Sequence, residues 1–145
     1  MADAIETRLK DVMAGYASDP AKGDMLLQVA CAQASDPLPL YRVLYKFYNR
    51  LRRFEVAGDY AARALSEAAR QGGLPQDYAD WTREHIAGLK PHLASQVLLA
   101  LKATAFIALR SGDESGARPC LAKLAELDPE DGSGVSVVMS LADGV

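Results

Sequence analysis

The chain has 145 residues, half of them apolar, with a formal net charge of −3 and a sequence pI near 5.3. This size and composition exclude a wholly disordered protein and favour a single domain with one hydrophobic core. The negative net charge provides no overall attraction for nucleic acid or for an anionic membrane, so any basic surface must be local.

Two helices are predicted in the first 37 residues. The first has one apolar face, made of Ile5, Leu9, Val12, Met13 and Tyr16. The second has another, made of Met25, Leu26, Val29 and Ala30. Ala-Ser-Asp-Pro occurs at 17–20 and again at 34–37. Both copies are helix-start signals, because a Ser or Asp side chain caps free N–H groups and Pro tolerates the first helical turn. We therefore place the first helix pair within 6–37.

A second pair of helices is predicted over 38–71. Its second helix runs from about Glu55 to Gln71, until Gly72-Gly73 and Pro75 stop it. One face of that helix is made of small and apolar residues: Ala57, Ala61, Ala64, Leu65 and Ala68. An inserted helix is then predicted over about 76–90, with Tyr78, Trp81, His85 and Leu89 on one face.

A long helix is predicted from Pro91 to Arg110, followed by a turn at Gly112-Asp113 and a further helix that ends before Pro129. The helical unit that includes this turn spans 98–131. A capping helix is predicted over 134–143. No alternating run bounded by hairpin turns competes with these helices, so the chain is expected to be all-α.

The three units resemble the tetratricopeptide repeat (TPR), a helical hairpin of about 34 residues. With Leu98 as position 1, the third unit has Leu101 at position 4, Ala105 at 8 and Ala117 at 20. With Leu38 as position 1, the second has Tyr41 at position 4, Tyr48 at 11 and Ala57 at 20. The resemblance implies one domain over 1–145, an α-solenoid of seven to eight helices coiled into a short right-handed superhelix.

In TPR proteins the first helix of each pair lines a concave groove, and positions 2, 5, 9, 12 and 13 contact the ligand. The resemblance therefore implies seven partner-binding residues: Lys10, Arg42, Lys46, Asn49, Arg50, Lys102 and Arg110. The residues themselves point the same way, since 38–53 contains five basic residues and no acidic one. Such a face suits carboxylates. The alternatives are a solvated basic face and salt bridges to acids on neighbouring helices.

We therefore expect a non-enzymatic protein–protein interaction module, an adaptor or a chaperone-like protein, that binds a peptide or partner protein with acidic groups. The alternative is a structural or assembly subunit that self-associates into a homo-oligomer or docks into a larger complex. The sequence argues against nucleic-acid binding, because Tyr41, Tyr45 and Tyr48 fall at core positions of the repeat and the remaining chain supplies no positive stripe.

No enzymatic motif is present: there is no nucleophile paired with a base, no phosphate-binding glycine loop and no paired carboxylates in an apolar setting. No cofactor is expected. A metal site could be drawn from Asp77, Asp80, Glu84, His85 and His92. We expect none, because His85 is predicted to face the apolar side while the acids face away.

The start of the chain, Met1-Ala2-Asp3-Ala4, lacks the basic and apolar regions of a signal peptide. The most apolar segment, about 93–109, is interrupted by polar residues: Ser95, Gln96, Lys102 and Thr104. We expect it to be a buried helix and too polar for a bilayer span. Cys31 and Cys120 belong to no Cys motif, so two reduced core thiols in a cytoplasmic protein are expected.

Overall fold

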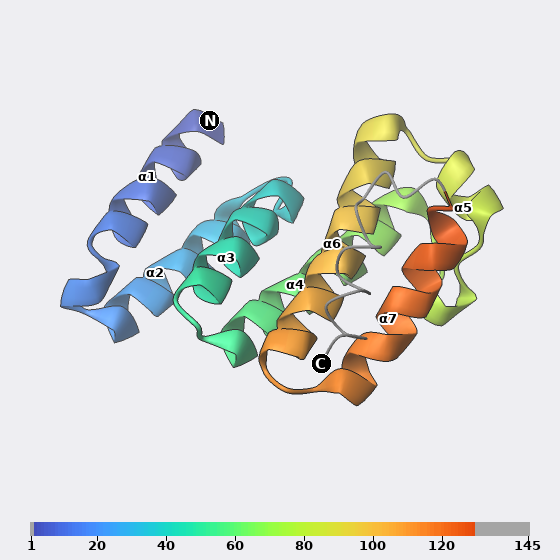
Figure 1. Cartoon of the computed structure of the whole chain (residues 1–145). Helices are drawn as coiled ribbons and strands as arrows, with labels where there is room; N and C mark the ends of the chain where they lie inside the picture. The colour runs from blue at the N-terminus through green and yellow to red at the C-terminus, as the bar shows by residue number, and fades with distance from the viewer. Residues whose placement is uncertain (1, 130–145) are drawn as a thin grey trace.

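Helices are the only regular secondary structure in residues 2–129, the part of the chain that the computed structural model describes (Figure 1). The seven α-helices there are α1 (Ala2–Ala14), α2 (Pro20–Gln33), α3 (Leu38–Arg50), α4 (Phe54–Gly72), α5 (Arg83–Ala87), α6 (Pro91–Arg110) and α7 (Glu114–Leu127). Two 3₁₀ turns accompany them, η1 (Tyr16–Ser18) and η2 (Tyr78–Asp80). The all-α prediction is confirmed. The predicted capping helix over 134–143 lies outside the described residues, as do 130–131 of the third unit.

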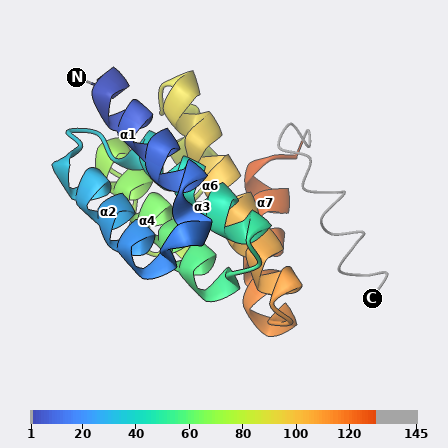
Figure 2. The same ribbon diagram turned by 90° about the vertical axis from the view of Figure 1, so that its left-hand side faces the viewer.

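The long helices lie side by side in chain order, from α1 at one edge to α7 at the other (Figure 1). Helix α4 packs against both α3 and α6, helix α6 packs against α7, and α1 packs against α2. Figure 2 looks onto α1 and α2 at the N-terminal edge, with the other helices behind them. The connections 51–53 and 111–113 are so short that each joins two antiparallel neighbours.

Local signals at the helix ends explain where most helices begin and stop. Asp19 caps α2 by accepting a hydrogen bond from the N–H of Lys22 at 3.2 Å, and Pro20 is the first helical residue, as predicted. Helix α6 has the predicted bounds, and Gly112 after it takes a φ of 87°, which glycine adopts at little cost. At the corresponding turn after α3, Arg52 takes a φ of 62° although it is not a glycine.

The hydrophobic core is centred on α4, which is covered on two sides. Its inward residues are small and almost completely buried: Ala57, Ala61, Ala64, Ala68 and Ala69. Because an alanine side chain ends at Cβ, α3 and α6 can both approach the α4 backbone closely. Larger side chains from the neighbours, such as Leu44 and Leu101, fill the remaining space and are fully buried.

Helix α6 is apolar enough, by length and composition, to cross a membrane: it has 20 residues and a window of mean hydropathy 1.5. The expectation that its polar residues exclude a span is therefore not supported by composition alone. In the structure α6 packs against α4 and α7, with Val97, Leu101 and Ala105 buried. Only 28% of the apolar window is buried, so packing against α4 and α7 accounts for part of its apolar sequence.

A polar cluster joins the α1–α2 pair to α3 and α4. Asp24 of α2 accepts hydrogen bonds of 2.6 Å from the hydroxyls of both Tyr16 and Tyr48. Arg53, which precedes α4, forms an ion pair of 2.9 Å with Asp24, donates to the Tyr16 hydroxyl, and lies over the Tyr48 ring. Since Tyr48 is fully buried, its hydroxyl depends on Asp24 for a partner.

The predicted inserted helix over 76–90 is not one continuous helix in the structure. The segment forms η2 and the five-residue α5, with Trp81 and Thr82 extended between them. Trp81 is buried, and its indole N–H donates to the Pro75 carbonyl at 2.6 Å, which a continuous helix would not allow. Thr82 then starts α5 with a capping box, in which His85 Nδ1 accepts a hydrogen bond from the Thr82 N–H. His85 is therefore a capping residue, contrary to its predicted place on an apolar helix face.

Candidate functional site

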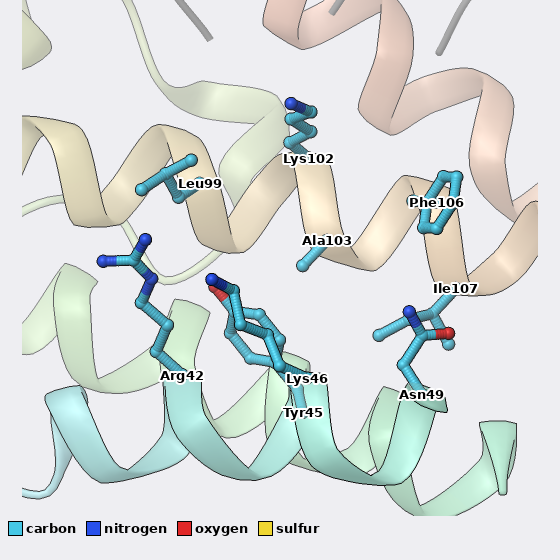
Figure 3. A pocket seen from close by; sticks show the side chains of 9 residues that line it. All are labelled: Arg42, Tyr45, Lys46, Asn49, Leu99, Lys102, Ala103, Phe106 and Ile107. Atoms are coloured by element: carbon cyan, nitrogen blue, oxygen red, sulfur yellow. The ribbon is translucent and has the colours of Figure 1, made fainter. Parts of the chain in front are cut away.

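A groove with a cavity volume of about 270 Å³ lies between α3 and α6, which run side by side in the same direction (Figure 3). Nine residues line it: Arg42, Tyr45, Lys46 and Asn49 of α3, and Leu99, Lys102, Ala103, Phe106 and Ile107 of α6. The parallel course follows from the array, because α3 and α6 each pack antiparallel to α4 between them. The two sides of the groove therefore come from helices that are not consecutive in the chain.

The groove combines an apolar floor with a cationic rim. Tyr45 and Ile107 are buried in the floor, and Leu99, Ala103 and Phe106 are half-buried beside them. Burial raises the pKa of the Tyr45 hydroxyl, and the charge of Arg42 opposes this in part. The phenol is therefore neutral at physiological pH. An occupant of this floor would have to offer apolar side chains.

Three of the six cations among the predicted partner-binding residues stand on the rim. Arg42 and Lys46 reach from α3 toward α6, while Lys102 extends from α6 on the side away from α3 in this view (Figure 3). Within residues 2–129, none of these three side chains forms a hydrogen bond or an ion pair. The described part of the chain thus does not use them in salt bridges between helices, which was one of the alternatives.

Arg110 was also predicted to bind the partner, but it closes one end of the groove. Its guanidinium donates to the Asn49 side-chain oxygen at 2.9 Å and to the Asn49 carbonyl at 3.3 Å. It also lies over the rings of Phe54 and Phe106, with centroid distances of 4.9 and 6.0 Å. The Asn49 carbonyl also accepts a hydrogen bond from the Arg52 N–H at 3.1 Å, and a cation at the carboxyl end of α3 is favourably placed relative to the helix dipole. Arg110 therefore links the ends of α3 and α6.

Lys10 and Arg50 do not line the groove. Lys10 is exposed on α1, and Arg50 is exposed as the last residue of α3. The structure thus brings together Arg42, Lys46, Asn49 and Lys102 from the predicted set, places Arg110 at their end, and leaves these two outside. A partner longer than the groove would be needed to contact them.

The sequence prediction named cations and Asn49, and it did not include the apolar residues that line the groove. Two of its members had a usable signal, since the register from Leu98 puts Leu99 at position 2 and Phe106 at position 9, both groove positions of the repeat. Tyr45, Ala103 and Ile107 had none. Their exposure to the groove depends on the spacing between α3 and α6, which the register does not provide.

Other chemistry in the described residues is limited. No group of three or more His, Cys, Asp and Glu side chains in residues 2–129 is placed to hold a metal ion. Cys31 and Cys120 are buried free thiols. Burial raises the pKa of Cys31 to about 11, against a smaller opposing effect of Arg63, and burial also raises the pKa of Cys120. Such thiols react slowly with thiol reagents at neutral pH.

Comparison with protein-family models, with curated proteins and with solved structures finds no match for this chain.

Proposed function

We propose that this protein is a non-enzymatic, TPR-like binding module that holds an acidic, partly apolar segment of a partner protein in the groove between α3 and α6. The observation that carries the proposal is the pairing of an apolar floor with Arg42, Lys46 and Lys102, whose side chains form no ion pair within residues 2–129. Arg offers a carboxylate two parallel hydrogen bonds, and Lys offers it a mobile point charge. The proposal includes an adaptor or chaperone-like role in the cytoplasm.

The dimensions of the groove imply weak and salt-dependent binding. A cavity of about 270 Å³ accepts one or two apolar side chains. Exposed rim ion pairs contribute about 0.2–1 kcal/mol each. After the loss of rotational and translational freedom, the dissociation constant for a short peptide should be on the order of 10–100 μM. Such values suit a reversible adaptor.

Reversing two rim charges should weaken capture of an acidic probe. The probe is a fluorescein-labelled peptide of alternating Glu and Leu, measured by fluorescence polarisation at low and high salt. The double variant Arg42→Glu/Lys46→Glu should bind it at least about tenfold more weakly and lose most of the salt dependence. Because both side chains are at the rim, the melting temperature should change little.

A matched control separates the groove from general charge. The variant Lys22→Glu/Lys90→Glu makes the same change of net charge at two exposed lysines on α2 and before α6, outside the groove lining. It should bind the probe like the unmodified protein. A probe with Gln in place of Glu should bind neither protein well. Equal loss in both variants, or no loss in the first, would contradict the proposal.

The alternative function, assembly through self-association, is favoured by one surface feature. Met25 and Val29 lie one turn apart on α2 at the N-terminal edge of the array, with exposed fractions of 57% and 44%. If they form a dimer contact, light scattering should give a molar mass that rises with concentration and returns to 15.6 kDa in the variant Met25→Lys/Val29→Lys. A constant 15.6 kDa over a wide concentration range would exclude this alternative.

A further inference from the structure

The residues that follow α7 are complementary to the groove in both charge and polarity. From Asp128 to Asp143 the chain has four acidic residues and no basic one. Between the acids, after Gly132-Ser133-Gly134, stands a group of apolar residues: Val135, Val137, Val138, Met139 and Leu141. An acidic stretch, a glycine-rich spacer and an apolar stretch are what the cationic rim and apolar floor would accept.

We propose that residues 130–143 of this chain occupy the groove between α3 and α6 and compete there with the partner. The proposal rests on the proposed function, because it assigns the regulation of the same site. It makes the protein self-inhibited: the partner binds only when it displaces the chain's own acidic and apolar segment. The occupant is a segment of known sequence, so the idea is testable without the partner's identity.

The distance to the groove is within reach of this segment. Helix α7 runs antiparallel to α6, so its last residues return toward the amino-terminal half of α6, and Leu99 and Lys102 line the groove near the middle of α6. Two hydrogen bonds hold the end of α7 against the segment that precedes α6, from Lys123 to the Trp81 carbonyl and from Arg83 to the Glu126 carbonyl. Crossing one helix of about 10–12 Å diameter needs about three to four extended residues at 3.3 Å each.

Along this path the acidic residues of the segment would lie opposite the basic residues of the groove. The acids Glu130 and Asp131 would pass over α6, where Lys102 extends on the side away from α3 (Figure 3). The apolar stretch beginning at Val135 would then reach the floor, and Asp143 would meet Arg42 and Lys46. Tethering supplies an effective concentration on the order of 1 mM, so a segment of about 0.1 mM affinity would weaken partner binding about tenfold.

The position of the segment can be measured with a nitroxide spin label on the Ser140→Cys variant of the full chain. The native thiols Cys31 and Cys120 are buried, so the new thiol should be labelled selectively. We expect paramagnetic broadening of the backbone amides of Lys46, Lys102 and Ala103, relative to a diamagnetic label. Broadening confined to exposed residues of α7 such as Ala122 and Ala125, or no broadening of α3 and α6, would overturn the proposal.

A mixture of spin-labelled chain and isotope-enriched unlabelled chain tests whether the segment acts on its own groove. The enriched chain should show no broadening; broadening in the mixture would assign the groove to the segment of a second copy and overturn the proposal. A further variant, Glu130→Gln/Asp131→Asn/Asp143→Asn with Val138→Ser/Met139→Ser, should lose the broadening and bind the Glu/Leu probe about tenfold more tightly.

The failure of this inference is distinguishable from failure of the proposed function. If the probe binds and Arg42→Glu/Lys46→Glu removes binding, but the segment variant binds no better and no broadening occurs, the proposed function stands and the inference falls. If the label broadens the groove but no acidic probe binds even to the segment variant, the self-contact stands and the proposed function falls.

Discussion

Replacing Asp24 by alanine should lower the free energy of unfolding by about 2–4 kcal/mol. The carboxylate accepts hydrogen bonds from Tyr16 and Tyr48 and pairs with Arg53, so its removal leaves three groups without their partner. The ion pair itself is partly exposed, at 40% for Arg53 and 28% for Asp24, and contributes little after solvent screening. Most of the loss should come from the buried Tyr48 hydroxyl. Denaturant unfolding followed by circular dichroism measures it.

The pH dependence of the free energy of unfolding, compared between the unmodified protein and Asp24→Ala, provides a second measurement. Burial raises the pKa of Asp24, but hydrogen bonds from Tyr16, Tyr48 and Arg53 and the charge of Arg53 lower it more, so it lies below its ordinary value of 3.8. A lowered folded-state pKa means that this stabilisation is complete above about pH 5 and is lost as the pH falls through the folded pKa. The stability difference between the protein and Asp24→Ala should therefore shrink below pH 3.8. A difference that is constant down to pH 2 would contradict the assignment.

Trp81→Ala should be at least as destabilising, by about 3–5 kcal/mol. Trp81 is 1% exposed, packs edge-on against Tyr78, and donates to the Pro75 carbonyl. Its own carbonyl accepts a hydrogen bond from Lys123 of α7. Removal of the indole leaves a cavity between η2 and α7 and an unpaired carbonyl, and it loosens the connection that leads to α6.

The comparison with Trp81→Phe separates volume from hydrogen bonding. Phenylalanine keeps most of the ring volume but cannot donate to Pro75, so we expect a loss of about 1–2 kcal/mol. Both variants should be followed by circular dichroism, because Trp81 is the only tryptophan in the chain and its fluorescence is lost in each. A loss below 1 kcal/mol in Trp81→Ala would show that the indole is not a structural anchor.

Much of the helical order could be predicted because its signals are local. Pro91 and Gly112 set the bounds of α6 through backbone geometry, and the structure has the predicted bounds. The alanine periodicity of α4 likewise predicted the face that is buried. These features depend on residues within one or two helical turns of each other, so a single sequence contains the information. The TPR resemblance itself stays a prediction.

Most of the features that could not be predicted depend on residues far apart in the chain, and Trp81 is an exception. Trp81 lies at a helical offset from Tyr78 and His85, yet its burial and its bond to Pro75 outweigh the helical pattern. Asp24 and Tyr48 are 24 residues apart, and nothing near either residue indicates the other. Arg110 was predicted to contact the partner, but in the structure it bonds to Asn49, 61 residues away in the chain, which the sequence did not indicate.

The link between Arg110 and Asn49 has a mechanical consequence for the groove. It fastens α3 to α6 at the carboxyl ends of both helices, whereas at the opposite end Arg42 and Leu99 face each other with no hydrogen bond between α3 and α6. Two rods joined at one end change their separation most at the other. Occupants of different thickness should therefore be accommodated by a splaying of the Arg42 end, and selectivity for size should be strictest next to Phe106.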